Sequence, residues 1–310
     1  MYIGINMQKI EIINKINQLK KEKNAVILAH CYQNVEIDEV ADFVGDSLHL
    51  SQMAAKTDAE IIVFAGVYFM AETAKILSPN KKVLLPRMES GCLMADMIDV
   101  EQLREFKSKY PGIPVVCYVN SSAEVKSESD ICCTSSNAVN VVKSLGVDKV
   151  LFVPDTYLGN FVSSKLPNIE VITYPGYCPT HLRITVEDIN KMKEKYPKAL
   201  VLTHPECHKE VVKISDYVGS TTGIIKFAKE SDNKSFIICT EKGVVERLER
   251  DYKDKEFHLV SSRAVCPNMK WNHLEDILSS LSEEKYEINV DSQIAEKAFN
   301  AINKMIHINS

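Results

Sequence analysis

The sequence predicts an α/β protein of three homologous α/β/α domains, each with a short parallel sheet, in a pseudo-threefold arrangement around a central cavity. Short apolar runs alternate with helical patterns along the chain, which is typical of parallel sheets covered by helices on both faces. Each third of the chain repeats the same order of runs. A single cysteine follows the last run of each third, at Cys92, Cys178 and Cys266, at intervals of 86 and 88 residues.

Two further sets of residues keep this register, which is the signature of an internal repeat. Residues that end the first apolar run of each third lie 88 and 86 apart, at His30, Tyr118 and His204. Hydroxyl residues follow each of them by 17 positions, at Ser47, Ser135 and Thr221. The alternative is a chance coincidence of spacings, but many independent markers agree.

The elements of the first third can be read in order. Residues 8–22 have the pattern of an amphipathic helix, and 25–30 form an apolar strand. Apolar residues at i, i+3, i+4 and i+7 predict a helix over 35–45. A second helix is expected over 47–57, with Ser47 as its N-cap.

The same third continues with a strand at 61–66, a helix at 69–77 and a last strand at 81–86, directly before the first cysteine loop. Later thirds repeat this order, with strands at 114–118, 150–155, 169–176, 199–204, 236–241 and 257–262. The tail, 287–308, is expected to be one last helix that packs on the first domain.

Length agrees with three domains, because single hydrophobic cores stop growing at roughly 250–300 residues and this chain has 310. The expected domains are 1–95 (joined by the C-terminal segment 268–310), 96–181 and 182–267.

Composition narrows the class of protein. Hydrophobic residues make up 45% and charged residues 25%, as in ordinary globular proteins. A net charge of −5 without a basic run argues against nucleic acid as a partner. The N-terminus lacks the apolar core of a signal peptide, and no apolar run reaches the ~20 residues that span a membrane. Nine cysteines then indicate metal ligands or buried thiols in a reducing, cytoplasmic setting.

The repeated markers predict a binding site, because ligands bind beyond the carboxyl ends of parallel strands. A second polar residue stands two positions after each strand-end marker, at Tyr32, Asn120 and Glu206. A single histidine or tyrosine at a strand end is more often structural, but six such residues in register favour a functional site. The three hydroxyl residues have two explanations, simple N-capping or the binding of an anion at a helix N-terminus.

Three converging thiolates would hold an iron–sulfur cube and leave one iron open. The alternatives are an iron–sulfur electron carrier, which usually has four cysteine ligands, and a zinc hydrolase, which favours histidine. A nucleotide-binding enzyme is a third, but no glycine-rich phosphate loop is present. The other cysteines are expected to pack in the core, with Cys207 a weak alternative ligand. The roles of Glu72 and Glu241 stay open between a salt bridge and the site.

Several motifs, taken together and in order, resemble the quinolinate synthase family. They are Ala29-His30-Cys31-Tyr32-Gln33, Asp46-Ser47-Leu48, Gly91-Cys92-Leu93-Met94-Ala95-Asp96, Tyr118-Val119-Asn120-Ser121-Ser122-Ala123-Glu124, Cys133-Thr134-Ser135-Ser136-Asn137-Ala138, His204-Pro205-Glu206-Cys207 and Cys266-Pro267-Asn268-Met269-Lys270. Members often have tyrosine in place of Cys31, and some carry a Cys-x-x-Cys pattern at the third ligand, which is absent here.

The resemblance implies an enzyme of de novo NAD biosynthesis. It would condense iminoaspartate (iminosuccinate) with dihydroxyacetone phosphate into quinolinate, phosphate and water, a transferase- or lyase-type condensation and dehydration. It implies a [4Fe-4S] cluster held by Cys92, Cys178 and Cys266, and an L-aspartate oxidase or dehydrogenase that supplies the imine.

By position, the substrate contacts implied are His30, Ser47, Tyr118, Asn120, Ser135, His181, His204, Glu206 and Thr221. We expect Glu206 to be the general base and acid, with Tyr32 and Tyr118 as further catalytic candidates. The open iron is expected to act as a Lewis acid on a hydroxyl or carboxylate of an intermediate.

Overall fold

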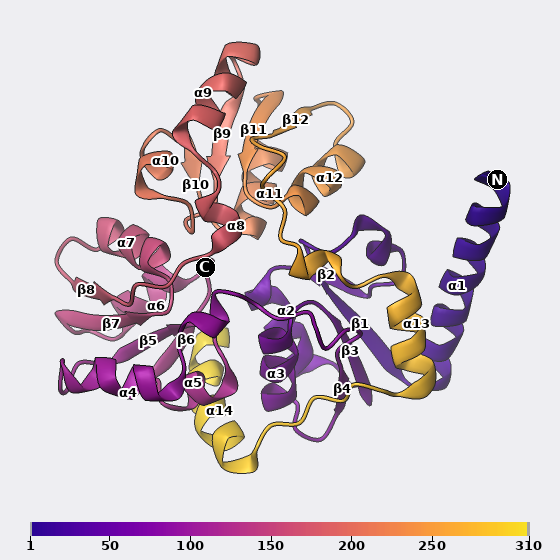
Figure 1. Ribbon diagram of the computed structural model, residues 1–310, viewed down its shortest axis with the longest axis horizontal. Helices are drawn as coiled ribbons and strands as arrows, with labels where there is room; N and C mark the ends of the chain where they lie inside the picture. The colour runs from indigo at the N-terminus through magenta and orange to yellow at the C-terminus, as the bar shows by residue number, and fades with distance from the viewer. Residues whose placement is uncertain (1, 309–310) are drawn as a thin grey trace. The chain divides into compact units, whose positions relative to one another are not determined.

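A computed structural model describes residues 2–308 and contains three four-stranded sheets, in which all neighbouring strands are parallel. In each sheet the strand that comes first along the chain lies second in the sheet, between the second and third strands. Helices flank all three sheets (Figure 1). The α/β class and the three repeated sheets are therefore confirmed, while the pseudo-threefold arrangement stays a prediction.

The first sheet has the order β2-β1-β3-β4, with strands β1 (Ala25–His30), β2 (Phe43–Gly45), β3 (Ile61–Ala65) and β4 (Lys82–Leu84). The helices of this domain are α1 (Tyr2–Glu22), the 3-10 helix η1 (Val35–Glu39), α2 (Ser47–Lys56), α3 (Tyr68–Leu77), the 3-10 helix η3 (Asn268–Lys270) and α13 (Leu274–Glu283). The strands expected in this third of the chain are all present.

The second sheet has the order β6-β5-β7-β8, with strands β5 (Val115–Tyr118), β6 (Ile131–Cys133), β7 (Lys149–Val153) and β8 (Glu170–Thr173). Its helices are the 3-10 helix η2 (Ala95–Met97), α4 (Val100–Ser108), α5 (Ala123–Ser127), α6 (Ala138–Ser144), α7 (Thr156–Lys165) and α8 (Pro179–Leu182).

The third sheet has the order β10-β9-β11-β12, with strands β9 (Leu200–Thr203), β10 (Tyr217–Val218), β11 (Ser235–Cys239) and β12 (Glu256–Leu259). Its helices are α9 (Val186–Lys195), α10 (Lys209–Lys213), α11 (Thr221–Glu230) and α12 (Lys242–Asp251). The last helix of the chain is α14 (Ser292–Ile306).

The chain forms two compact units. One comprises Met1–Cys92 and Pro267–Ser292, and therefore contains the first sheet. The other comprises Leu93–Cys266 and Gln293–Ser310, and contains the second and third sheets.

A partly buried polar contact recurs in all three sheets and shows the internal repeat in the structure. An aspartate just before the short second strand accepts a hydrogen bond from the backbone N–H of the first strand. The pairs are Asp42 with Ile27 (2.8 Å), Asp130 with Val115 (2.7 Å) and Asp216 with Val201 (2.7 Å). Each bond satisfies a strand donor that the ladder leaves unpaired.

The helix expected over 35–45 is wrong. The segment is a short 3-10 helix, η1, followed by strand β2, whose residues pair in parallel with Leu28–His30 of β1. Its apolar residues face the core as expected, since Ile37 and Val40 are buried. Apolar residues spaced over only two helical turns fit a longer helix as well as one helical turn followed by a strand. Here the second half of the segment forms a strand because it pairs with the edge of β1.

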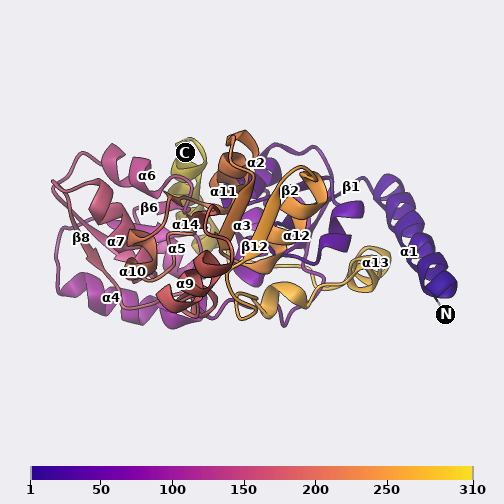
Figure 2. The same ribbon diagram turned by 90° about the horizontal axis from the view of Figure 1, so that it is seen from above.

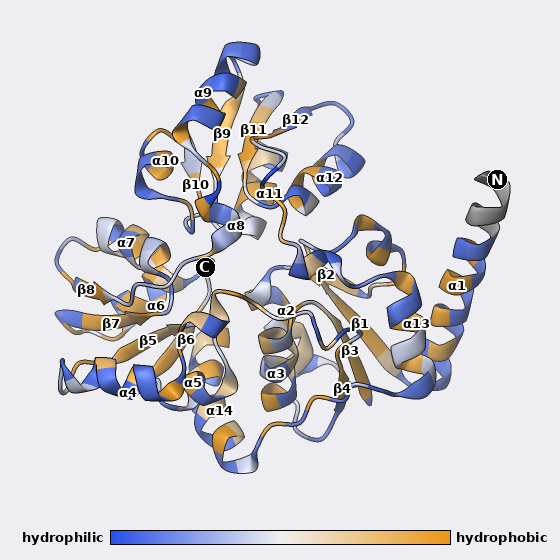
Figure 3. Ribbon diagram, viewed as in Figure 1, coloured by the Kyte–Doolittle hydropathy of each residue, from blue (hydrophilic) through white to orange (hydrophobic). Residues whose placement is uncertain are grey.

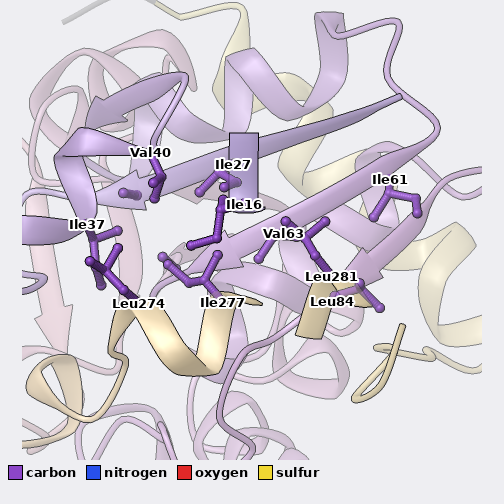
Figure 4. Packing of buried hydrophobic residues seen from close by; sticks show 12 residues of the cluster. Ile16, Ile27, Ile37, Val40, Ile61, Val63, Leu84, Leu274, Ile277 and Leu281 are labelled. Atoms are coloured by element: carbon purple, nitrogen blue, oxygen red, sulfur yellow. The ribbon is translucent and has the colours of Figure 1, made fainter. Parts of the chain in front are cut away.

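The core of the first unit lies between its sheet and the helices α1 and α13. Ile16 of α1, Ile27 of β1 and Ile277 of α13 belong to one buried cluster (Figure 4). The strands are apolar along their length, whereas the helices carry polar residues on their outer faces (Figure 3). Figure 2 shows α1 and α13 at the same end of this unit. Helix α13 was absent from the sequence-based expectations.

Replacing Ile277 with alanine should destabilise this unit by about 2–5 kcal/mol, because it removes a fully buried side chain and leaves a cavity. Chemical denaturation followed by circular dichroism would measure the change. Ile10→Ala is the matched control, since Ile10 on α1 is 56% exposed and should change stability by less than about 0.5 kcal/mol. Equal effects of the two substitutions would contradict the packing described here.

The C-terminal helix differs from its expected place. The sequence assigns 268–310 to the first domain, but only Pro267–Ser292 lies in that unit. Helix α14 packs with the second domain, where Asn137 Nδ2 donates to the carbonyls of Met305 (3.0 Å) and Ile308 (2.8 Å). The reason is that α1 and α13 already cover the first sheet, so that face has no room for another helix.

Over residues 2–308, no helix has the length and apolar character needed to cross a membrane.

Candidate active site

The carboxylate of Glu206 is the centre of a buried polar network in the second unit. Glu206 lies in the loop after β9 and is 3% exposed. The Tyr118 hydroxyl, at the end of β5, donates to its Oε1 at 2.6 Å. The Nδ1 atom of His181 lies 2.6 Å from its Oε2. Two strand ends and one helix from different domains therefore meet at a single carboxylate.

His181 connects this carboxylate to a thiol. Its Nδ1 is also 3.2 Å from the Sγ of Cys178, and its Nε2 is 2.9 Å from the Oγ1 of Thr240. Cys178 is the N-cap of the short helix α8, and His181 lies in the single turn that follows, where Pro179 begins the helix. Residues three apart share one helix face, so the thiol and the imidazole point the same way.

His204 brings a second imidazole to the same place. Its ring stacks on that of His181, with centroids 4.7 Å apart and planes 27° apart. Its Nδ1 accepts the backbone N–H of Glu206 (3.4 Å), and its Nε2 lies 3.1 Å from the Oγ of Ser135. Because Nδ1 accepts, Nε2 carries the proton in the neutral ring and donates to Ser135.

The same backbone bond recurs in the first unit. There the Tyr32 N–H donates to His30 Nδ1 (3.1 Å), and the two rings meet edge to face at 4.6 Å. In both repeats the histidine ring is therefore oriented by the backbone N–H of the residue two positions later. This bond explains why the sequence shows these residues in pairs.

The electrostatics of the Glu206 site favour one charged carboxylate. Burial opposes the ionisation of Glu206. The interactions with His181 and His204 and the hydrogen bonds from His181 and Tyr118 have a larger, opposite effect. The pKa of Glu206 therefore lies well below its ordinary value. Asp155 nearby is wholly buried, and this burial and the charge of Glu206 raise the pKa of Asp155 well above its ordinary value. Glu206 thus holds the charge and Asp155 the proton.

The stability of Asp155→Asn relative to the wild type should increase as the pH rises above about 4. Folded Asp155 keeps a proton that the unfolded chain releases above pH ~4, so this group lowers stability by up to about 1.4 kcal/mol per pH unit there. Asparagine cannot titrate, and its Oδ1 can still accept from the Leu158 N–H as Asp155 does at 2.7 Å. Thermal unfolding across this pH range measures the difference.

Asp155→Ala is the control, since it removes the hydrogen bond to Leu158 as well and should destabilise the protein even at low pH. Parallel stability curves for the wild type and Asp155→Asn would contradict a neutral buried Asp155.

Hydroxyl residues at the helix starts are not the caps. The N-cap of α2 is Asp46, whose carboxylate accepts from His49 N–H, and the N-cap of α11 is Ser220. Ser47 and Thr221 are the first residues inside these helices, so N-capping as an explanation for them is wrong. Asn137, not Ser135, precedes α6. The hydroxyls of Ser47 and Thr221 are therefore not used as caps.

Asn120 offers an unpaired acceptor. Its Oδ1 is buried and has no hydrogen-bond partner within residues 2–308. Buried polar atoms are nearly always paired, so this atom is a candidate contact for a bound molecule. Asn120 lies two residues beyond Tyr118, in the same unit as Glu206.

The cysteines divide into two classes by exposure. Cys92, Cys178 and Cys266 are partly exposed, and the six others are buried. The expectation of core packing is therefore confirmed for those six, Cys207 included. None of these nine cysteines forms a disulfide within residues 2–308.

Each of the three partly exposed cysteines follows a loop held in the same way. A backbone N–H at the start of the neighbouring helix donates to the carbonyl two residues before the cysteine. The pairs are Tyr68 with Ser90 (2.7 Å), Thr156 with Gly176 (2.9 Å) and Lys242 with Ala264 (2.9 Å). Accessible thiols on three equivalently held loops suit the three-cysteine ligand set of an iron–sulfur cluster, because thiolates are its usual ligands.

Three residues of this region were missed or left open by the sequence. Thr240 fixes the His181 ring, and Asp155 lies beside Glu206. Glu241 accepts from the Cys266 N–H (3.3 Å) and the Gly243 N–H (2.6 Å), so it supports the third cysteine loop and caps α12. Asp155 and Glu241 lie 86 residues apart, in the register of the repeat. That spacing could have indicated them.

Sequence-derived candidates fall into both units. Tyr118, Ser135, Cys178, His181, His204 and Glu206 come together in the second unit. Asn120, Thr221 and Cys266 belong to the same unit. His30, Tyr32, Ser47 and Cys92 belong to the first unit. Glu72 is a buried residue of α3 in that unit.

These features define a class of α/β protein with three repeated parallel sheets, a buried polar network around one carboxylate and three partly exposed cysteines on equivalent loops. The family model described as "Quinolinate synthetase A protein" matches residues 14–307. The quinolinate synthase of Alkaliphilus metalliredigens is 55% identical over 302 residues, which cover 97% of this chain and 100% of the relative. That of Dehalococcoides mccartyi (strain CBDB1) is 54% identical over 297 residues, covering 96% and 98%. The chain belongs to the quinolinate synthase family.

Proposed function

We propose that this chain condenses iminoaspartate (iminosuccinate) with dihydroxyacetone phosphate to give quinolinate, phosphate and water in de novo NAD biosynthesis. The observation that carries the proposal is the Glu206 carboxylate, held by Tyr118 and His181 directly beside the Cys178 thiol. Family membership supports the overall reaction. An L-aspartate oxidase or dehydrogenase would supply the imine, and nine cysteines without a disulfide within residues 2–308 fit a reducing, cytoplasmic setting.

Cys92, Cys178 and Cys266 would hold a [4Fe-4S] cluster. When bound with three cysteine ligands, it supplies one open iron that acts as a Lewis acid. The protein must then provide the proton transfers and the binding of the anionic substrates.

Glu206 is suited to accept a proton first. It is ionised in the free enzyme, and its burial favours proton uptake once a bound substrate displaces the bonds from His181 and Tyr118 that lower its pKa. Ring formation takes protons from carbon and gives them to the oxygen that leaves as water. Once protonated, Glu206 can return the proton to that oxygen, and the Tyr118 hydroxyl on Oε1 can relay it.

Polar groups around this carboxylate are suited to hold carboxylates or phosphate. His204 Nε2–H and Ser135 Oγ form one such pair, and the unpaired Oδ1 of Asn120 can accept from a substrate hydroxyl or amine. His181 offers a second imidazole. We assign Thr221, His30 and Ser47 as further contacts, and Tyr32 as a second proton donor.

Anaerobic reconstitution with iron and sulfide tests the proposal. About four irons and four sulfides should bind per chain, as a [4Fe-4S] cube requires, and quinolinate should form only when both substrates are present. Iron without sulfide, or a full cluster without quinolinate formation, would overturn it. The first result would indicate a simple metalloenzyme, and the second an electron carrier.

A further inference from the structure

We propose that the chain, when it lacks its iron–sulfur cluster, binds one zinc ion between the Cys178 thiolate, the His181 imidazole and the Glu206 carboxylate. The Sγ, one ring nitrogen and one carboxylate oxygen of these residues all lie within 4.8 Å of one another. This site uses one cluster cysteine and two residues of the acid–base network. Zinc binding itself does not depend on the proposed reaction, whereas the competition between zinc and the cluster rests on the proposed function.

The donor set is one that zinc prefers. Thiolate sulfur, imidazole nitrogen and carboxylate oxygen bind Zn²⁺ at about 2.0–2.3 Å, and three protein ligands plus an open position are typical of accessible zinc sites. Around a tetrahedral ion such atoms lie roughly 3.3–3.6 Å apart. His181 Nδ1 is 3.2 Å from Cys178 Sγ and 2.6 Å from Glu206 Oε2. Only a small rotation of the carboxylate is therefore needed to admit the ion.

Two of the ligands come from a single helical turn. Cys178 caps α8 and His181 lies three residues later. Because the helical turn already fixes both residues, binding the ion costs little further conformational entropy. Glu206 enters from the loop after β9, where Tyr118 already holds its other oxygen. Cys178 is partly exposed, which gives the ion a path to an otherwise buried site.

Each buried ligand has an outer partner that orients it. The His181 ring is fixed at Nε2 by Thr240 Oγ1 (2.9 Å), and Glu206 Oε1 accepts from Tyr118 (2.6 Å). Metal-binding histidines almost always bond through the second ring nitrogen in this way. Both partners bind the outer atoms, so that His181 Nδ1 faces Cys178 Sγ at 3.2 Å and Glu206 Oε2 lies 2.6 Å from that Nδ1.

Charge balance also favours the ion. One thiolate and one carboxylate neutralise Zn²⁺, so the buried carboxylate gains a full counter-charge. On binding, the proton of the Cys178 thiol is released to solvent, and the neutral His181 ring coordinates through Nδ1 with its proton on Nε2, facing Thr240. Because Cys178 serves only one metal at a time, zinc and the iron–sulfur cluster exclude each other. A zinc-loaded chain should therefore resist cluster assembly until the zinc is chelated.

Cobalt provides a visible probe of this site. The full-length chain, freed of iron and kept reduced under anaerobic conditions, should bind one Co²⁺ and show a sulfur-to-cobalt charge-transfer band with the strong d–d bands of a four-coordinate ion. Zn²⁺ should displace it one for one. Cys178→Ala should remove the charge-transfer band. Thr240→Val should keep the band but weaken binding by about 10–100-fold, because it removes only the outer partner of His181.

Two further pairs of variants distinguish this site from the cluster ligands. Cys92→Ala and Cys266→Ala should leave the cobalt spectrum unchanged, whereas His181→Gln and Glu206→Gln should weaken binding more than Thr240→Val. Loss of the band in Cys92→Ala would place the ion among the cluster cysteines and overturn the proposal. Unchanged affinity in both His181→Gln and Glu206→Gln, each with a native circular dichroism spectrum, would also overturn it.

Discussion

Replacing Cys92, Cys178 or Cys266 with alanine is expected to reduce bound iron from about four per chain to near zero and to abolish quinolinate formation. These are the three partly exposed thiols, each behind a loop held by the same backbone hydrogen bond. A cube left with two protein ligands has two open irons and is lost readily. Iron and sulfide analysis after anaerobic reconstitution measures the effect, together with a direct assay of quinolinate.

Cys239→Ala is the matched control. Cys239 is a buried thiol of β11 in the third sheet, and it is outside the register of the three partly exposed cysteines. This variant should retain iron and turnover, with only a loss of stability from the small cavity. Normal iron content in any one of the three ligand variants would remove that cysteine from the cluster.

Glu206→Gln should lower turnover by about 10²–10⁴-fold while the cluster content stays normal. Glutamine keeps the shape of the side chain and can still accept from the Tyr118 hydroxyl, but it cannot take up a proton. Its charge is also lost from between His181 and Tyr118. Steady-state rates measured with a constant iron content isolate the effect on the reaction.

Glu210→Gln is the control for this substitution. Glu210 lies on the neighbouring helix α10, where it pairs with Lys213 on the exposed surface. Its replacement should leave turnover within a factor of about two, since a surface ion pair contributes little. Turnover of Glu206→Gln near that of this control would remove Glu206 from the catalytic role.

Much of the fold could be predicted because its determinants are local and repeated. Apolar runs such as 25–30 and 61–66 became parallel strands, and the three cysteines stand at equivalent loops. The errors share one cause, which is competition between distant segments. Residues 35–45 have a helical period, but pairing with β1 makes half of them a strand. Helix α14 was assigned to the first domain, but α13 already occupies that sheet.

The candidate site shows the same division. Glu206, Tyr118, His181 and His204 were expected from the repeat and the family motifs, and the structure places them within hydrogen-bond or stacking distance. Thr240 and Asp155 were not expected. Thr240 has no distinctive local sequence, and its importance comes from lying beside His181. The spacing of Asp155 from Glu241 could have indicated it, but its protonation depends on its burial and on the nearby charge of Glu206.

The amino-acid sequence alone determined the class of fold, the register of the threefold repeat and the identity of the accessible cysteines, because these depend on apolar periodicity and on spacing along the chain. Only the tertiary structure decided which carboxylate is charged, which ring nitrogen faces which partner and which helix covers which sheet. Those properties depend on distances between residues far apart in the chain, such as the 2.6 Å from His181 to Glu206, and burial makes each such contact strong.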